Sequence, residues 1–312
     1  MKASVIAVAA IAASVAGAAH AEENRYIAPN GSGSVCTAAA PCRYPIDAWN
    51  SLGGVNGTIH TLSDGFYSGL STFGFAYGFS IQGTGPGTQL STYAVSSAST
   101  LDLALTNVSM SSIGGSFAAA GSMLIDDVTF RKTSPLGFYF APSGAASLTI
   151  RNSSFHDAST GTGAAIRIVT GGHNVNVTLD NVKVSGGIRG IVIDASGGGW
   201  AKVTIKDSTF TNIIGPAIYG TAGSGNVRLY LDNVTATNSN VGVVMAGANS
   251  LAWMTRSTIA GNATGIQQAS GSKVFSYKNN YIFNNGTDGV PLPTSPSPAQ
   301  GMPSGEIASA LK

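Results

Sequence analysis

Charged residues are scarce in this chain of 312 residues. Lysine and arginine together number 16 and aspartate and glutamate 14, so the formal net charge is only +2. A nucleic-acid-binding surface normally needs a clustered excess of basic side chains to displace counterions from the phosphates. The basic residues here are scattered among acidic ones, so we expect no nucleic-acid partner.

The sequence also lacks the short motifs of common enzyme classes. It contains no Gly-x-Ser-x-Gly, no phosphate-binding loop, no His-Glu-x-x-His and no dinucleotide fingerprint. Beyond residue 21, the three histidines are His60, His156 and His173, which are too dispersed to suggest a metal site. We therefore expect neither a metal nor another cofactor.

The first 21 residues have the pattern of a cleaved secretory signal peptide. Lys2 gives a short basic start, residues 5–18 are small and apolar, and residues 19–21 form a small-x-small cleavage site. A membrane anchor is the weaker alternative, since the apolar run is short, rich in alanine and followed at once by two glutamates. We expect a mature protein that is secreted, periplasmic or on the cell surface, without a membrane span.

Only two cysteines are present, Cys36 and Cys42, six residues apart. Disulfides persist outside the cytoplasm, so we expect this pair to close a small loop. Two free thiols are the alternative. Zinc binding is disfavoured, because two cysteines without a nearby histidine cannot complete a zinc shell.

Most of the chain repeats at intervals of 20 to 29 residues. We use the term anchor residues for the polar positions Asn107, Asp127, Asn152, Asn181, Asp207, Asn233, Arg256 and Asn279. The positions two and four before each anchor and three after it are apolar, an alternation typical of short strands. Each repeat has no room for a crossover helix, so successive repeats must stack as coils with like strands parallel.

The anchor residues are expected to point inward, at the bend where the first strand of each repeat ends. Stacked asparagine side chains can hydrogen-bond from coil to coil and tolerate left-handed backbone angles. After the bend, each repeat continues through glycine into a second short strand.

This pattern resembles the right-handed parallel β-helix proteins of the pectate-lyase-like superfamily, over about residues 25–290. Residues 41–67, with a short helix expected over 45–52, are similar to the entry module of secreted members. The resemblance implies an all-β, right-handed parallel β-helix (solenoid) of nine to ten coils with an N-terminal helical cap. The expected divisions are a signal peptide (1–21), a cap with the disulfide loop (22–56), the β-helix (57–290) and a Pro/Ser-rich tail (291–312).

The catalytic patterns of this superfamily match poorly. The sequence contains no cluster of three carboxylates that could bind the calcium ion of a pectate lyase. Asp126 and Asp127 resemble the paired carboxylates of polygalacturonases, and Gly172-His173 resembles their Gly-His element. These two elements lie nearly two repeats apart here, whereas in that family they lie on consecutive coils. The superfamily includes lyases, hydrolases, adhesins and inert scaffolds, so the fold leaves the function open.

The residue just before each anchor alternates in charge over five consecutive coils. These residues are Asp126, Arg151, Asp180, Lys206 and Asp232. We interpret them as an outward-facing structural ladder in which each exposed pair contributes about 0 to 1 kcal/mol and opposes register slips.

Two outward surfaces are candidates for glycan binding. The first lies on the second strand of the repeat and includes Tyr139, Arg167 and Tyr219, where rings can stack on sugar faces and the guanidinium can bind hydroxyls. An ordinary surface with a loop packed over it is the alternative. The second is the pair Tyr230 and Trp253, which could equally be a contact between rods or be covered by the C-terminal segment.

Two functional classes remain. The first is a non-catalytic rod that binds a polysaccharide or cell-envelope glycan, which we favour because free carboxylates are scarce. The second is a polysaccharide lyase or glycoside hydrolase with a degenerate site around Arg167 and Asp194, and with His156 as the candidate proton-transfer group. Two carboxyl groups, or one carboxylate with Arg167, within about 10 Å in a groove would favour the enzyme.

The tail contains a high proportion of proline and is expected to be extended. Residues 306–311 could form one helical turn on the last coil. A cap of some kind is expected, because an open coil would offer unpaired strand edges.

Overall fold

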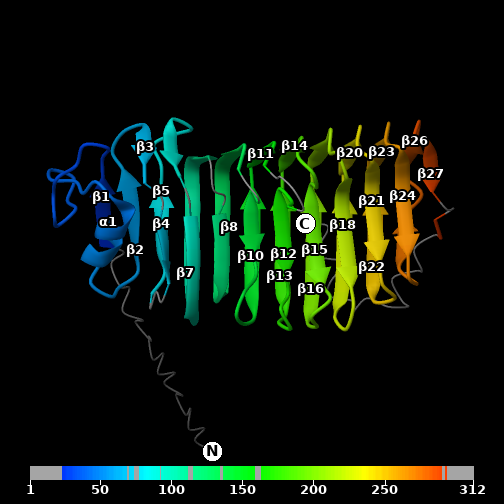
Figure 1. The fold of residues 1–312 in the computed structure, drawn as a ribbon, viewed down its shortest axis with the longest axis horizontal. Helices are drawn as coiled ribbons and strands as arrows, with labels where there is room; N and C mark the ends of the chain where they lie inside the picture. The colour runs from blue at the N-terminus through cyan, green and yellow to red at the C-terminus, as the bar shows by residue number, and fades with distance from the viewer. Residues whose placement is uncertain are drawn as a thin grey trace, which may run out of the picture.

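The computed structural model describes residues 23–68, 70–73, 77–91, 93–111, 115–133, 136–158, 163–289 and 292–293. The predicted signal peptide and nearly all of the tail lie outside these residues. Figure 1 shows a rod in which the strands follow one another side by side along the long axis. The protein is an all-β, right-handed parallel β-helix of about 9 turns with one short helix, as the sequence predicted.

Each turn passes through three columns of parallel strands, named columns A, B and C here. Column A contains the strands that end at the anchor residues. It comprises β1 (Glu23–Ile27), β2 (Gly57–Thr61), β5 (Phe79–Gln82), the middle of β7 (Tyr93–Ser111) and of β8 (Gly115–Arg131), β10 (Ala146–Arg151), β13 (Val175–Asp180), β16 (Trp200–Lys206), β19 (Asn226–Asp232), β22 (Ser250–Thr255) and β25 (Lys273–Ser276).

Column B follows the anchors, and column C is the second strand predicted for each repeat. Column B comprises β3 (Gly65–Tyr67), β6 (Thr88–Leu90), the ends of β7 and β8, β11 (Ser154–His156), β14 (Lys183–Ser185), β17 (Thr209–Thr211), β20 (Thr235–Thr237), β23 (Thr258–Ala260) and β26 (Tyr281–Phe283). Column C comprises β4 (Leu70–Phe73), the starts of β7 and β8, β9 (Phe138–Phe140), β12 (Ile166–Val169), β15 (Ile191–Ala195), β18 (Pro216–Ala222), β21 (Val241–Ala246), β24 (Thr264–Ala269) and β27 (Thr287–Gly289).

The core consists of apolar side chains that stack from turn to turn inside the rod. Ile125, Ile150 and Leu179 occupy the same inward position on successive strands of column A, and all three are fully buried. On column B, the rings of Phe130 and Phe155 stack with their centroids 4.4 Å apart. Every turn therefore buries apolar surface against the turns on both sides, which stabilises the stack at roughly 25 cal/mol per Å².

The anchor residues form the bend, but the prediction that they point inward is wrong. From Asn107 to Arg256 each of them has a φ of 50 to 54°, and most of their side chains are exposed. One left-handed residue shifts the inward-outward alternation by one position, so the residue after each anchor is the buried one. Asparagine and aspartate suit this bend because they tolerate left-handed angles, not because they fill the core.

The exposed anchors still bond to one another across turns. Asn181 Nδ2 donates to Asn152 Oδ1 at 3.0 Å, and Asn233 Nδ2 donates to Asp207 Oδ1 at 2.7 Å. In the last turn the left-handed residue is Lys278 rather than the predicted Asn279. The pairing of Trp253 with Phe275 shows the same shift of one residue, so Phe275 faces outward and not inward.

A second bend, which sequence analysis did not identify, separates columns B and C. Its left-handed residues lie five positions after the anchors in most turns. They are Lys132, Asp157, Gly186, Asn212, Asn238 and Gly261. Two single-residue bends per turn explain how a short column B fits between two longer columns.

The N-terminal end is closed by the predicted cap. Helix α1 (Pro45–Ser51) buries Ala48, and Trp49 stacks on Tyr77 with a centroid distance of 4.9 Å. The predicted disulfide between Cys36 and Cys42 is present, and both cysteines are fully buried. Within the described part of the chain, no helix has the length and apolar character needed to cross a membrane.

Candidate functional site

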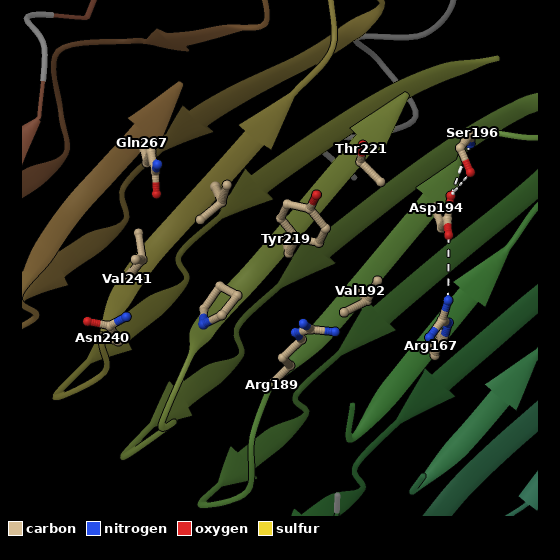
Figure 2. Close-up of a pocket in the computed structure, with 12 residues that line it drawn as sticks. Arg167, Arg189, Val192, Asp194, Ser196, Tyr219, Thr221, Asn240, Val241 and Gln267 are labelled. Atoms are coloured by element: carbon tan, nitrogen blue, oxygen red, sulfur yellow. Dashed lines mark hydrogen bonds and ion pairs between the residues drawn. The ribbon is translucent and has the colours of Figure 1, made fainter. Parts of the chain in front are cut away.

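A groove runs over the outward face of column C. Its volume is about 530 Å³, and it crosses the strands from β12 to β24. Figure 2 shows Tyr219 near its middle, with Arg167 and Arg189 toward one side and Asn240 and Gln267 toward the other. Residues far apart in sequence thus meet on one surface.

The repeat aligns the residues along this groove. Arg167, Val192, Tyr219, Val244 and Gln267 occupy the same outward position on five successive strands. The two valines are almost fully buried and form an apolar floor. Polar groups around this floor come from a neighbouring row and from the turns.

Arg167 and Asp194 form the charged part of the groove. Arg167 Nη2 lies 3.6 Å from Asp194 Oδ2, and the Arg167 side chain is 32% exposed. Asp194 Oδ1 also accepts hydrogen bonds from the backbone N of Ser196 at 3.0 Å and from its hydroxyl at 2.5 Å. The carboxylate is therefore held in place by its own turn and by the arginine one turn away.

The Arg167 Nε atom is buried and has no hydrogen-bond partner. A buried donor without a partner costs about 1 to 3 kcal/mol, so such groups are uncommon in proteins. The ion pair at 3.6 Å is also longer than the usual contact between a guanidinium and a carboxylate. Arg167 thus holds one buried donor, Nε, without a partner among the described residues.

Sequence analysis grouped these residues only in part. Tyr139 pairs with Arg167 one turn earlier, on β9, but is not among the residues that line the groove. Sequence analysis missed Arg189, Ser196 and Asn240, which also line it. All three lie in the turns around column C, whose lengths vary, and the period of the strands gives no position for them.

His156 does not line the groove. It lies on β11 in column B, where its Nδ1 is 2.8 Å from the hydroxyl of Ser185. Burial, and secondly the charge of Arg131, lower the pKa of His156, while Asp157 opposes them. The structure therefore does not bring His156 together with Arg167 and Asp194, as the enzyme hypothesis required.

The second candidate surface, Tyr230 and Trp253, is a stack of rings on column A. Their centroids are 5.0 Å apart with planes 11° apart, and Phe275 stacks on the other side of Trp253 at 5.7 Å. Rings that are nearly parallel and this close lie face to face. A sugar stacks on a ring face, so the ring faces in this stack are partly occupied already.

The alternating charges lie one turn apart on column A. Arg151 Nη2 is 2.8 Å from Asp126 Oδ2, and Lys206 Nζ is 2.8 Å from Asp180 Oδ2. Asp232 lies next to Lys206 but binds Arg256 through two hydrogen bonds of 2.8 and 2.6 Å. The last pair of this row thus uses an anchor residue that the sequence analysis had not assigned to it.

No group of three or more histidine, cysteine, aspartate or glutamate side chains that could hold a metal ion occurs among the residues the structure describes. A further pocket of about 220 Å³ lies on column A near β5 and includes one carboxylate, Asp102. It lacks the combination of ring, guanidinium and carboxylate found on column C. The column C groove is therefore the better candidate site.

Comparison with known proteins supports the fold. The family model described as "right handed beta helix region" matches residues 189–299, which include all the residues lining the groove except Arg167. No curated protein and no solved structure matches the chain. The fold supports a structural or polysaccharide-related protein, and it does not by itself separate binding from catalysis.

Proposed function

We propose that this β-helix protein is a non-catalytic rod that binds a polysaccharide chain along the groove of column C. The observation that carries the proposal is the composition of the groove: an apolar floor, one central ring and mostly neutral hydrogen-bonding groups across five successive strands. An extended groove fits a linear polymer better than a compact small molecule.

The lining residues offer the contacts that sugars need. Tyr219 is half-buried beside the floor, where it can contact the apolar face of a pyranose ring. Thr221, Asn240 and Gln267 offer hydroxyl and amide groups to sugar hydroxyls. Arg167 adds a guanidinium that is 32% exposed and can donate to a sugar hydroxyl or an acidic substituent.

The same groove is poorly equipped for hydrolysis. Glycosidases use two carboxyl groups on either side of the bond that breaks. Among the described lining residues only Asp194 carries a carboxylate, and it is held by Arg167 and Ser196. Binding without cleavage follows from this shortage.

A polysaccharide lyase is the second candidate, and the pair formed by Arg167 and Asp194 favours it. A carboxylate and an arginine 3.6 Å apart in a groove meet the geometric criterion derived from the sequence. In an elimination reaction one group removes a proton while a cation stabilises the developing charge. The absence of His156 from the groove leaves this reading without its proposed proton-transfer group.

Export is part of the proposal. The pattern of residues 1–21 is that of a signal peptide, and the disulfide between Cys36 and Cys42 is a bond that persists outside the cytoplasm. A glycan on the cell surface or in the surroundings would then be accessible to the groove.

The test combines a glycan array with a product assay. We expect the protein to bind specific polysaccharides on the array. We also expect it to leave them intact, so that the product assay detects neither new reducing ends nor unsaturated products. Cleavage of a retained polysaccharide would replace the binding proposal with the enzyme. Retention of no glycan at all would contradict both.

Variants locate the site. Arg167→Ala and Tyr219→Ala should each lower the affinity for a retained glycan about tenfold, equivalent to about 1.4 kcal/mol. The matched controls are Arg43→Ala and Tyr44→Ala, an arginine and a tyrosine in contact with each other near the N-terminal cap. Equal losses in the controls would show that the groove is not the binding site.

A further inference from the structure

The last turn of the rod breaks the outward pattern of column B. Tyr281 lies directly over Thr258, and Phe283 lies over Ala260. Threonine also occupies the first of these positions one turn earlier, at Thr235. Small side chains are thus replaced by large aromatic rings in a single turn.

These rings are unusually open to solvent. Tyr281 is 68% exposed, Phe283 53% and Tyr277, just before the bend, 41%. We define these three residues as the aromatic tip. Soluble proteins rarely leave a cluster of large apolar side chains exposed unless it contacts another molecule.

Positive charges lie beside the aromatic tip. Lys273 precedes Tyr277 by four residues, Lys278 follows it directly, and both lysines are exposed. The only acidic residue between 273 and 289, all of which the structure describes, is Asp288 on β27 in column C. Its Oδ1 accepts a hydrogen bond of 2.7 Å from Asn285. Two lysines against one aspartate give the last turn a net positive charge.

The backbone that carries the rings is tied to the preceding turn. Lys278 is the left-handed residue of this bend, with a φ of 64°. Asn279 Nδ2 donates to the hydroxyl of Thr255 at 2.9 Å. Asn280 Nδ2 donates to the carbonyl oxygen of Met254 at 2.8 Å. The backbone is therefore preorganised and loses little conformational entropy when the tip binds a partner.

The chemistry of the tip favours a partner that is both apolar and anionic. A second copy in a twofold contact would place the same lysines near one another, and like charges repel. A lipid surface with anionic headgroups has hydrocarbon for the rings and negative charge for the lysines. Tyrosine suits the boundary between the two, because its ring is apolar and its hydroxyl is polar.

The position of the tip also fits a lipid surface. Figure 1 shows β26 and β27 at the end of the rod opposite helix α1. The three rings do not line either of the two pockets described above. A flat lipid surface can cover rings at the end of a rod without a groove to receive it.

From the exposed rings, the flanking lysines and their place at the end of the rod, we propose that the aromatic tip attaches this protein to a lipid surface that carries anionic headgroups. The rings enter the boundary between headgroups and acyl chains, and Lys273 and Lys278 contact the lipid phosphates. The described residues supply no strand beyond β26 and β27. Unpaired backbone groups are costly in hydrocarbon, so insertion stops at the level of the headgroups.

The first test removes the rings and measures co-sedimentation with vesicles. Tyr281→Thr/Phe283→Ala carries the residues that the preceding turn holds at the same register positions, so the β-helix accepts them. The matched control is Phe66→Gln, which replaces a 61% exposed ring of column B near the N-terminal end with the residue type of its register partner. The wild type and the control should bind vesicles of equal parts phosphatidylcholine and phosphatidylglycerol, and the double variant should bind them about tenfold more weakly.

The second test removes the positive charges. Lys273→Gln/Lys278→Asn keeps a residue that tolerates the left-handed bend and should lower the affinity for the same vesicles about tenfold. The matched control is Lys132→Asn/Lys183→Gln, which likewise changes one left-handed lysine and one exposed strand lysine. The control should bind as the wild type does. Vesicles of phosphatidylcholine alone should bind the wild type about tenfold more weakly than the mixed vesicles.

Three results would overturn the proposal. One is a wild type that does not bind the mixed vesicles, or tip variants and controls that lose affinity equally. Another is binding of poly-L-glutamate but not of vesicles, which would make the partner an acidic polypeptide. The third is a concentration-dependent dimer that the ring variant abolishes, without vesicle binding, which would make the partner a second copy. The tip lies outside the column C groove, so its variants should leave glycan affinity unchanged.

Discussion

Columns A and C both present rows of polar and aromatic side chains to solvent, but the side chains of the two rows differ in how closely they contact one another. On column A, Asp126 contacts Arg151 at 2.8 Å, and Trp253 lies between two other rings. On column C, Arg167 and Asp194 are 3.6 Å apart, one buried donor is unpaired, and a groove of about 530 Å³ is open above an apolar floor. The side chains of column A thus contact one another from turn to turn, whereas the side chains of column C leave a groove that a ligand can occupy.

This difference separates stability from binding. Complementary neighbours in a stacked repeat, such as opposite charges, can bond from turn to turn, and such rows oppose slippage of the register. A row that mixes arginine, valine, tyrosine and glutamine, as column C does, cannot bond in this way. Changes on column A should therefore affect unfolding, and changes on column C should affect ligand affinity.

The largest effect on column A is expected at its ring stack. Trp253→Thr introduces a threonine, which is the residue type found two turns earlier in the same outward row, at Thr204. It should lower the free energy of unfolding by about 2 kcal/mol, because the contacts to Tyr230 and Phe275 are lost. Urea unfolding measures this change. A loss of glycan affinity at unchanged stability would instead make the stack a binding surface.

A smaller effect is expected from reversing one charge of column A. Asp232→Lys would remove two hydrogen bonds to Arg256 and place a cation between Arg256 and Lys206. It should lower the melting temperature at low salt and lower it less at high salt, because salt screens the repulsion between exposed cations. Asp232→Asn serves as the control for the loss of the pair without repulsion. An unchanged melting temperature for Asp232→Lys would contradict a structural role of the row.

The smallest effect is a pH dependence that Asp126 contributes. Burial opposes the shift, but hydrogen bonds from Arg151 and Asn152 lower the pKa of Asp126 in the folded protein. The unfolded chain therefore binds the proton first as the pH falls, so this stabilisation is present above about pH 4 and is lost as the pH falls through the lowered pKa. Unfolding curves of the wild type and Asp126→Asn should converge at low pH. A constant difference down to low pH would contradict the assignment.

The repeat predicted the fold well because its signal is periodic. Alternating apolar positions around residues such as Ile150 and Leu179 determine which residues stack, and the structure pairs these two directly. The helix observed at residues 45–51 was expected over 45–52 from the resemblance to secreted β-helix proteins, and the Cys36–Cys42 disulfide was predicted from the spacing of the two cysteines and the expected export. These features depend on short stretches of sequence and on one period.

The errors arose where a single residue changes the phase of the pattern. Sequence alternation placed Asn152 inside, but its positive φ rotates the chain and leaves it exposed. The second bend was missed because glycine replaces asparagine or aspartate there at Gly186 and Gly261. Turns of varying length then set which polar groups reach the groove, so Arg189 and Asn240 could not be found from the period.

The most direct test of the central claim is a crystal structure of the protein with a polysaccharide fragment chosen from the array. We predict an intact fragment along column C, in contact with Tyr219 and hydrogen-bonded to the guanidinium of Arg167. A fragment bound over Tyr230 and Trp253 on column A, or a cleaved product in the groove, would contradict the account.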